Sequence, residues 1–186
     1  MSAPSRIHAT LYCDGSALVV LPTGEVAHIW ASRQDGCLTR WAWEISDGDD
    51  APSGYSYSQD LAYRCACQAS AKRTMRPARV AGFTLADAQA LEDVDRTAYN
   101  KRLKALLFAS TGHRGFTVRG STGTAYSWIR VEGTDERGRL WVAAIFGHQQ
   151  AQIPPTRGYR AHAAACAAGL PNAHEIKRSE HAWEGN

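Results

Sequence analysis

Residues 116–131 constrain the fold of this chain more than any other segment. Two runs of β-favouring residues flank a turn built from glycine, serine and threonine, a pattern typical of a β-hairpin. Because side chains alternate between the faces of a strand, Tyr126, Trp128 and Arg130 are expected on one face and the residues between them on the other. The glycines lie between two strands, so they indicate a hairpin turn rather than a phosphate-binding loop, which leads from a strand into a helix.

Residues 1–73 show the pattern of a β-meander closed by a helix. Short apolar runs separated by turn residues predict the strands, and Trp41, Trp43 and Ile45 alternate on the side expected to face the core. Ser58 is a suitable N-cap for the helix that follows. Spacings of three and four residues predict one apolar stripe on this helix, made of Leu61, Ala62, Cys65, Ala66 and Ala69.

Residues 84–172 predict a second unit of helices and strands. Thr84 and Asp87 have the spacing of a capping box that opens one helix, and a second helix ends at Gly112. The expected strands are residues 115–120, 124–132 and 139–146, the last two joined by a turn at 133–138, and the last helix is expected at residues 157–168. With a polar tail at 173–186, the chain is predicted to be α+β, with two small units of antiparallel strands packed with helices.

Charge is unevenly distributed along the chain, although the formal net charge is only +3. Residues 25–60 carry seven acidic and two basic side chains, and residues 47–54 within them are expected to form an acidic loop. Residues 64–79 carry five basic and no acidic side chains and end in a basic linker at 72–79. Residues 96–139 carry nine basic and three acidic side chains, so the predicted hairpin lies in a cationic block suited to steering an acidic partner.

Five cysteines and seven histidines offer candidate metal ligands, but their spacings do not favour a site. The cysteines are Cys13, Cys37, Cys65, Cys67 and Cys166, an odd and scattered set that indicates reduced thiols. Two positions apart on a helix, Cys65 and Cys67 point about 200° away from each other, so they do not share one zinc ion. Of the histidines, only His113 lies beside the basic hairpin. We therefore expect no metal and no cofactor.

The sequence contains no apolar run near the roughly 20 residues that a membrane-spanning helix needs. Its first residues are polar and lack the apolar core of a signal peptide. These patterns predict a cytoplasmic protein without a membrane partner.

The hairpin segment also carries a resemblance to a known group of domains. Residues 118–131 read VRGSTGTAYSWIRV, which resembles the VRGxxGTAYGWI hairpin of small accessory domains in phage and plasmid proteins, including those associated with large polyvalent proteins. Ser127 stands where glycine is usual. The resemblance implies an origin in a mobile element and a bacterial host cell as the setting, and it implies no residue-level activity.

Three functions are compatible with these features. The first is a non-enzymatic protein of a phage or plasmid that binds a host protein or ribonucleoprotein complex, as an anti-CRISPR-like or anti-restriction-like inhibitor of a nucleic-acid-targeting defence complex. The second is direct nucleic-acid binding by the basic half of the chain, for which the low net charge is unfavourable. The third is an enzyme with an unrecognised site, for which Asp14, His28, His113 and Tyr126 supply the available chemistry. No catalytic residue is predicted.

The candidate partner-binding residues are long cations and two aromatic side chains of the hairpin region. Arginine is poorly suited to a core and well suited to contacts with carboxylates or phosphates. Tyr126 and Trp128 either stack on exposed bases or pack the hairpin against a helix, and both possibilities stay open. The predicted set is Arg114, Arg119, Tyr126, Trp128, Arg130, Arg137 and Arg139.

Overall fold

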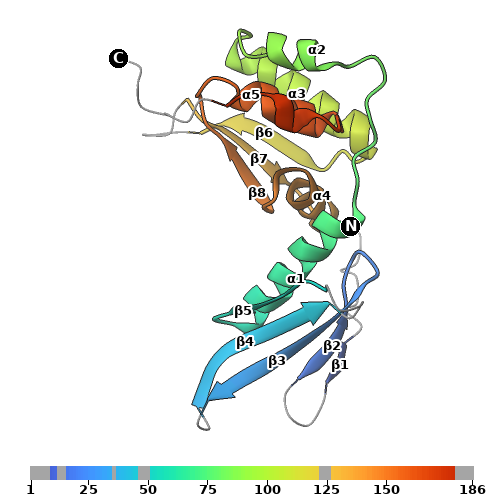
Figure 1. Ribbon diagram of the computed structural model, residues 1–186, viewed down its shortest axis with the longest axis vertical. Coiled ribbons are helices and arrows are strands. Elements are labelled where there is room, and N and C mark those ends of the chain that lie inside the picture. The colour runs from blue at the N-terminus through green and yellow to red at the C-terminus, as the bar shows by residue number, and fades with distance from the viewer. Residues whose placement is uncertain (1–8, 12–15, 35–36, 46–50, 122–126, 179–186) are drawn as a thin grey trace. The chain divides into compact units, whose positions relative to one another are not determined.

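The computed structural model describes residues 9–11, 16–34, 37–45, 51–121 and 127–178. The chain divides into two compact units, Met1–Met75 and Arg76–Asn186 (Figure 1). Each unit contains its own antiparallel sheet and at least one helix of its own, so the predicted α+β class is confirmed. No helix in the described part of the chain is both long enough and apolar enough to cross a membrane.

The first unit is a meander in which each strand pairs with the next one along the chain. The strands are β1 (Ala9–Leu11), β2 (Ala17–Val20), β3 (Val26–Gln34), β4 (Cys37–Ile45) and β5 (Ser53–Ser56), and the sheet order is β1-β2-β3-β4-β5. The strand β5 was not predicted, because its residues were expected to form the end of a loop. Gly54 pairs with Trp43 of β4, and a Cβ atom at Gly54 would lie only 3.0 Å from the Trp43 ring. A small residue is needed at this position under the indole.

The helix α1 (Gln59–Thr74) covers one face of this sheet, packing on β3, β4 and β5. The Ser58 hydroxyl caps it as predicted and accepts a hydrogen bond from the Leu61 amide (3.2 Å). The predicted apolar stripe is wrong in part, since Leu61 is 41% exposed and Cys65 is half-buried. The buried face is instead Ala62, Ala66, Cys67, Ser70 and Ala71. Large sheet residues such as Trp43 fill the core, so small helix residues allow close approach.

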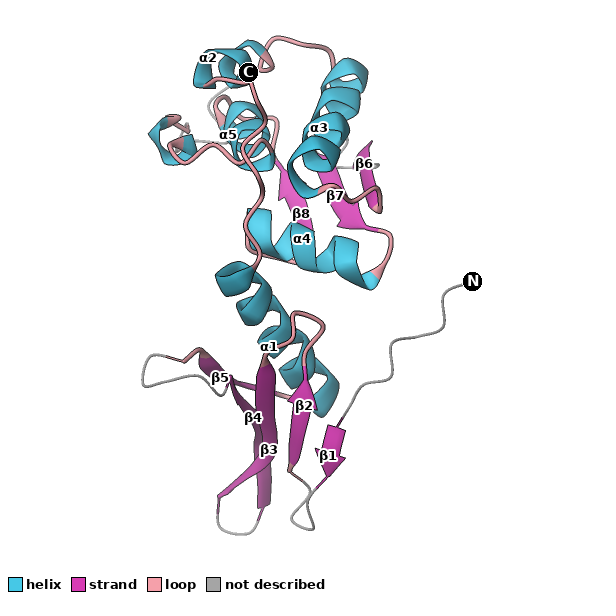
Figure 2. Ribbon diagram, turned by 90° about the vertical axis from the view of Figure 1, so that its right-hand side faces the viewer, coloured by secondary structure: helices cyan, strands magenta, loops and turns pink. Residues whose placement is uncertain are grey.

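The second unit combines helices with the strands of a smaller sheet (Figure 2). Its helices are α2 (Leu85–Ala90), α3 (Arg96–Thr111), α4 (Glu136–Phe146), α5 (Tyr159–Ala167) and the 3₁₀ turn η2 (Ala173–Glu175). Its strands are β6 (Phe116–Gly120), β7 (Ile129–Gly133) and β8 (Gln150–Ile153), in the order β6-β7-β8. The core joins Tyr99, Leu103 and Leu107 of α3 to alternate residues of the strands.

Two local helix signals of this unit act as predicted. The Thr84 hydroxyl accepts from the Asp87 amide (3.3 Å), and Asp87 Oδ2 accepts from the Thr84 amide (2.8 Å), which completes the capping box of α2. Gly112 adopts a left-handed conformation (φ 68°) and ends α3. Both signals depend on contacts within four residues, so the surrounding fold does not alter them.

The predicted strand at residues 139–146 is wrong, because this segment lies within the helix α4. Its run of aromatic and β-branched residues favoured a strand, but a short buried apolar run does not distinguish strand from helix. The deciding local feature is Asp135, which caps the helix by accepting from the Gly138 amide (2.7 Å). The segment predicted as a turn therefore contains the first helical turn. The third strand of the sheet is β8, which was not predicted.

Candidate binding surface on the second sheet

Strand register places two of the predicted arginines side by side. Arg119 of β6 lies opposite Arg130 of β7, which in turn lies opposite Gln152 of β8. The next row on this face is Thr117, Glu132 and Gln150. The alternate residues, including Ile129 and Val131, are buried in the core, so the two rows form the opposite, accessible face. We call this set of six residues the polar sheet face.

Glu132 holds both arginines of the polar sheet face. Its Oε2 atom accepts from Arg119 Nη2 (3.1 Å), and its Oε1 atom lies 2.6 Å from Arg130 Nη2. Like charges directly across a strand pair destabilise a sheet, and the shared carboxylate offsets this repulsion. The guanidinium groups are therefore ordered, and the three side chains together keep one net positive charge. The Arg119 side chain remains 60% exposed.

The other predicted arginines lie on different elements. Arg114 precedes β6, and its guanidinium lies over the ring of Phe108 in α3, 5.0 Å from the centroid. Arg137 and Arg139 are exposed in the first turns of α4, where they point about 200° apart. Cations at this end of a helix oppose its dipole, so their position is not explained by helix stability. Of the five arginines, register pairs only Arg119 with Arg130 among the described residues.

The two aromatic candidates do not extend the polar sheet face. Trp128 lies just before β7 and is half-buried, and its carbonyl oxygen accepts from the Ser121 amide (2.8 Å). The predicted strand at residues 124–132 thus begins later than expected, at Ile129, within the described part of the chain. Tyr126 lies outside the described residues. Strand alternation therefore does not place Trp128 on the same face as Arg130.

His113 has a structural partner at the junction of β7 and α4. Its Nε2 atom lies 3.0 Å from Asp135 Oδ1, and because a carboxylate only accepts, the imidazole donates. Partial burial raises the pKa of Asp135, but the Gly138 amide, His113 and Arg139 outweigh it and hold this pKa below its ordinary value. His113 therefore orients the N-cap of α4 and supports one end of the polar sheet face.

Close backbone approach fixes the same junction. A Cβ atom at Gly133 would lie 2.0 Å from the Arg139 nitrogen, and one at Gly138 would lie 2.3 Å from the Gly115 oxygen. The Thr134 amide donates to the Gly115 oxygen (2.9 Å), which ties β6 to the start of α4. The sequence analysis predicted a turn between two strands here and therefore missed these close backbone contacts. The spacing of Asp135 and Gly138 nevertheless suits the N-terminus of a helix.

Glu132 and Gln152 are members of this surface that the sequence analysis missed. Glu132 follows Arg130 by two positions, so strand alternation alone would have placed it on the same face. Gln152 had no such signal, because the strand that carries it was not predicted. Its place on the face depends on the pairing of β7 with β8.

Cysteine side chains are the candidate nucleophiles and metal ligands among the described residues. Cys166 lies 3.8 Å from both ring nitrogens of His162. Burial raises the pKa of the Cys166 thiol and lowers the pKa of His162, so the neutral forms of both are favoured, unlike an activated thiolate pair. No disulfide joins the described cysteines Cys65, Cys67 and Cys166, and the described residues contain no group of three potential metal ligands. Cys13 and Asp14 lie outside the described residues.

Comparison with known proteins adds no further assignment: no family model matches the chain, and the searches of curated proteins and of solved structures find no match.

Proposed function

We propose that this protein is a non-enzymatic binding protein whose polar sheet face contacts an acidic surface of a partner protein. The observation that carries the proposal is the pairing of Arg119 with Arg130 on an accessible sheet face, where both guanidinium groups are ordered by Glu132. Ordered arginines lose less side-chain entropy on binding and offer planar donors to carboxylates.

A protein partner fits this surface better than a phosphate backbone does. Binding to nucleic acid depends on the neutralisation of several phosphates, whereas Arg119, Arg130 and Glu132 together keep only one net positive charge. The polar sheet face also lacks an aromatic side chain among its six residues, so it offers no stacking platform for bases. Arginine and glutamine on a flat surface suit the polar contacts of a protein interface.

The biological setting is part of the same proposal. The resemblance of residues 118–131 to phage and plasmid accessory domains supports a mobile-element origin. A protein of this origin meets host complexes that recognise foreign nucleic acid, and the polar sheet face would contact an acidic surface of such a complex. The partner in this proposal is a host protein or ribonucleoprotein of a nucleic-acid-targeting defence complex, and the protein acts as its anti-CRISPR-like or anti-restriction-like inhibitor.

The proposal is tested by affinity capture with matched charge variants of the full chain. Arg119→Glu/Arg130→Glu reverses the paired cations, and Lys101→Glu/Lys104→Glu makes the same charge change on exposed positions of α3. Proteins captured from a bacterial lysate are identified by mass spectrometry. We expect a partner that the wild type and the α3 variant retain and that the sheet variant loses. A partner bound equally by all three proteins would rule out the polar sheet face.

Binding measured over a series of salt concentrations distinguishes nucleic acid from a protein as the partner. Purified wild-type protein is titrated with labelled single- and double-stranded DNA and RNA at increasing salt concentration. Phosphate contacts would produce affinity that falls steeply with salt and that is lost in Arg119→Glu/Arg130→Glu. That result would identify nucleic acid, and not a protein, as the partner of the polar sheet face.

A further inference from the structure

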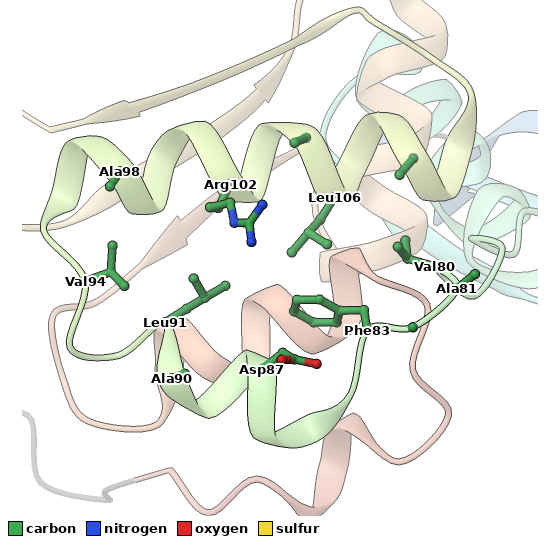
Figure 3. A pocket seen from close by; sticks show the side chains of 13 residues that line it. Val80, Ala81, Phe83, Asp87, Ala90, Leu91, Val94, Ala98, Arg102 and Leu106 are labelled. Atoms are coloured by element: carbon green, nitrogen blue, oxygen red, sulfur yellow. The ribbon is translucent and has the colours of Figure 1, made fainter.

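A second surface of the same unit is an open apolar groove between α2 and α3, with a volume of about 780 Å³ (Figure 3). One wall consists of Val80 and Phe83 before α2 and of Leu91 and Val94 after it. The other wall is a face of α3 that includes Leu106. The groove involves none of the six residues of the polar sheet face, so the two surfaces can be tested separately.

The α3 wall has the spacing of one helix stripe. Its lining residues are Ala98, Arg102, Ala105, Leu106 and Ala109, which recur every three or four positions and so lie in line along the helix. The stripe is about 16 Å long at the usual rise per residue. Ala105 and Ala109 are exposed and small, so a second backbone can approach α3 closely.

Hydrogen bonds to α5 hold the opposite wall in place. Glu92 Oε1 accepts from the Ala161 amide of α5 (2.7 Å), and Arg160 Nη1 donates to the Val94 carbonyl oxygen (3.3 Å). The Tyr99 hydroxyl donates to the Arg160 carbonyl oxygen (2.7 Å), which links α3 to the same helix. The walls are therefore fixed to a common support, and binding requires little reorganisation of the groove.

Arg102 is the cation among the residues that line the groove. It lies opposite Asp87, whose carboxylate already accepts hydrogen bonds from Thr84. Figure 3 shows the Arg102 guanidinium extending from α3 into the groove, with Asp87 on the α2 side. Asp87 Oδ2 already accepts from the hydroxyl (2.7 Å) and the amide (2.8 Å) of Thr84. These hydrogen bonds, and then the charge of Arg102, hold the pKa of Asp87 below its ordinary value. No ion pair joins Arg102 to a carboxylate of the described residues, so Arg102 is available to an incoming one.

From these features we infer that the groove binds an amphipathic helix of a partner protein. Apolar side chains at positions i, i+3 or i+4 and i+7 of that helix enter the groove, and one Asp or Glu of the helix pairs with Arg102. The groove length matches about three helical turns, and the exposed alanines form an open rim. A small apolar ligand would require a site that encloses most of its surface. The occupant is therefore a helix with an apolar seam and an acidic residue beside it.

The experiment uses a display library of amphipathic helical peptides of roughly four turns, with a fixed apolar seam and random remaining positions. Peptides are selected on the full wild-type chain and counter-selected on Ala105→Trp, in which an indole at an exposed helix position fills the groove. Circular dichroism and hydrogen exchange verify folding, and Ala109→Trp replaces the first variant if that protein does not fold.

Selected peptides are then synthesised and titrated against two charge variants. Arg102→Glu changes the groove, while Lys104→Glu makes the same change on α3 at a position that does not line it. We expect enriched peptides to carry an acidic residue, to bind Lys104→Glu like the wild type and to bind Arg102→Glu about tenfold more weakly. Changing the acidic residue of the peptide to lysine is expected to restore binding to Arg102→Glu.

Three results would overturn the inference. Equal weakening by Arg102→Glu and Lys104→Glu would show a general charge effect. Enriched peptides that bind Ala105→Trp or Ala109→Trp as tightly as the wild type would bind elsewhere. A selection that yields no peptide dependent on the groove would rule out an amphipathic helix as its occupant.

Discussion

The sheets of the two units both pack one face against helical structure, but their accessible faces differ in chemistry. In the first unit α1 covers one face of the sheet, and in the second unit helices including α3 do so. The accessible face of the first sheet includes Leu18, His28, Trp30, Glu44 and Tyr55. The rings of His28 and Trp30 stack with centroids 4.7 Å apart, and His28 Nδ1 lies 3.7 Å from Glu44 Oε1. The corresponding face of the second sheet has arginines and glutamines instead.

This difference shows that the side chains on the accessible face of a sheet can vary while the fold of the unit stays the same. Strand alternation requires apolar residues on one face alone, so the opposite face can become aromatic or cationic without changing the topology. In the first unit the core depends strongly on large sheet residues such as Trp43, because α1 contributes small ones. In the second unit α3 contributes Tyr99, Leu103 and Leu107. The predictions below test this contrast, beginning with the largest effect.

Trp43→Ala is expected to lower the free energy of unfolding of the first unit by about 3–5 kcal/mol, because it removes a large buried side chain and leaves a cavity. The matched control Tyr55→Ala truncates an aromatic residue on the other face, where it is 63% exposed. Hydrogen exchange of the full chain, resolved by residue, measures the stability of each unit. Equal effects of the two variants would contradict the assignment of the core face.

Gly133→Ala is expected to destabilise the second unit by about 1–3 kcal/mol, because the new Cβ atom collides with the backbone at the start of α4. The control is Thr134→Ala, a change of the next and exposed residue. Denaturant unfolding followed by exchange at residues of α4 reports the loss. If Gly133→Ala is as stable as the wild type, the backbone at this junction can move apart without a loss of stability.

Acidification is expected to destabilise the second unit through His162. Burial and then the charge of Arg178 lower the pKa of this histidine from 6.5, so the unfolded chain binds the proton more tightly. The contribution of His162 to the free energy of unfolding is therefore constant above pH 6.5 and decreases as pH falls from there toward the lower pKa of the folded state. His162→Gln should remove this slope, and His174→Gln, at an exposed position, should retain it. Unfolding curves between pH 5 and 7.5, a window of about one unit or more on each side of the ordinary value, measure it.

Glu132→Gln is expected to have the smallest effect on stability, about 0.5 kcal/mol, since partly exposed ion pairs contribute little. It leaves Arg119 and Arg130 without their shared carboxylate, so the polar sheet face gains positive charge. We expect later elution from a heparin column than for the control Glu136→Gln on α4. Coincident elution of the two variants would show that Glu132 does not limit the charge of this face.

Much of the helical structure was predictable, since its signals are local. Ser58, Thr84 with Asp87 and Gly112 act through bonds to atoms within four residues, and the structure places each as expected. The meander of the first unit was also predictable from turn residues. For the candidate surface, alternation identified the face of Arg130, while the partnership with Arg119 required the register of β6 and β7.

The errors lie where a distant segment decides the outcome. The strands β5 and β8 have four residues each and little propensity of their own, so they exist because a neighbouring strand offers free hydrogen-bonding groups. The buried side of α1 was likewise set by the bulk of Trp43 beneath it. Residues 139–146 are the exception, because the missed signal there is local: Asp135 caps the helix by accepting from the Gly138 amide.

The sequence by itself determined the α+β class, the helix caps and the concentration of arginine in residues 114–139. Only the tertiary structure decided that Arg119 and Arg130 share one carboxylate, that the other three arginines lie outside the polar sheet face, and that α2 and α3 form a groove beside Arg102. The physical reason is distance along the chain. Caps and turns form between neighbouring residues, whereas strand register and helix packing join residues whose positions depend on the whole core.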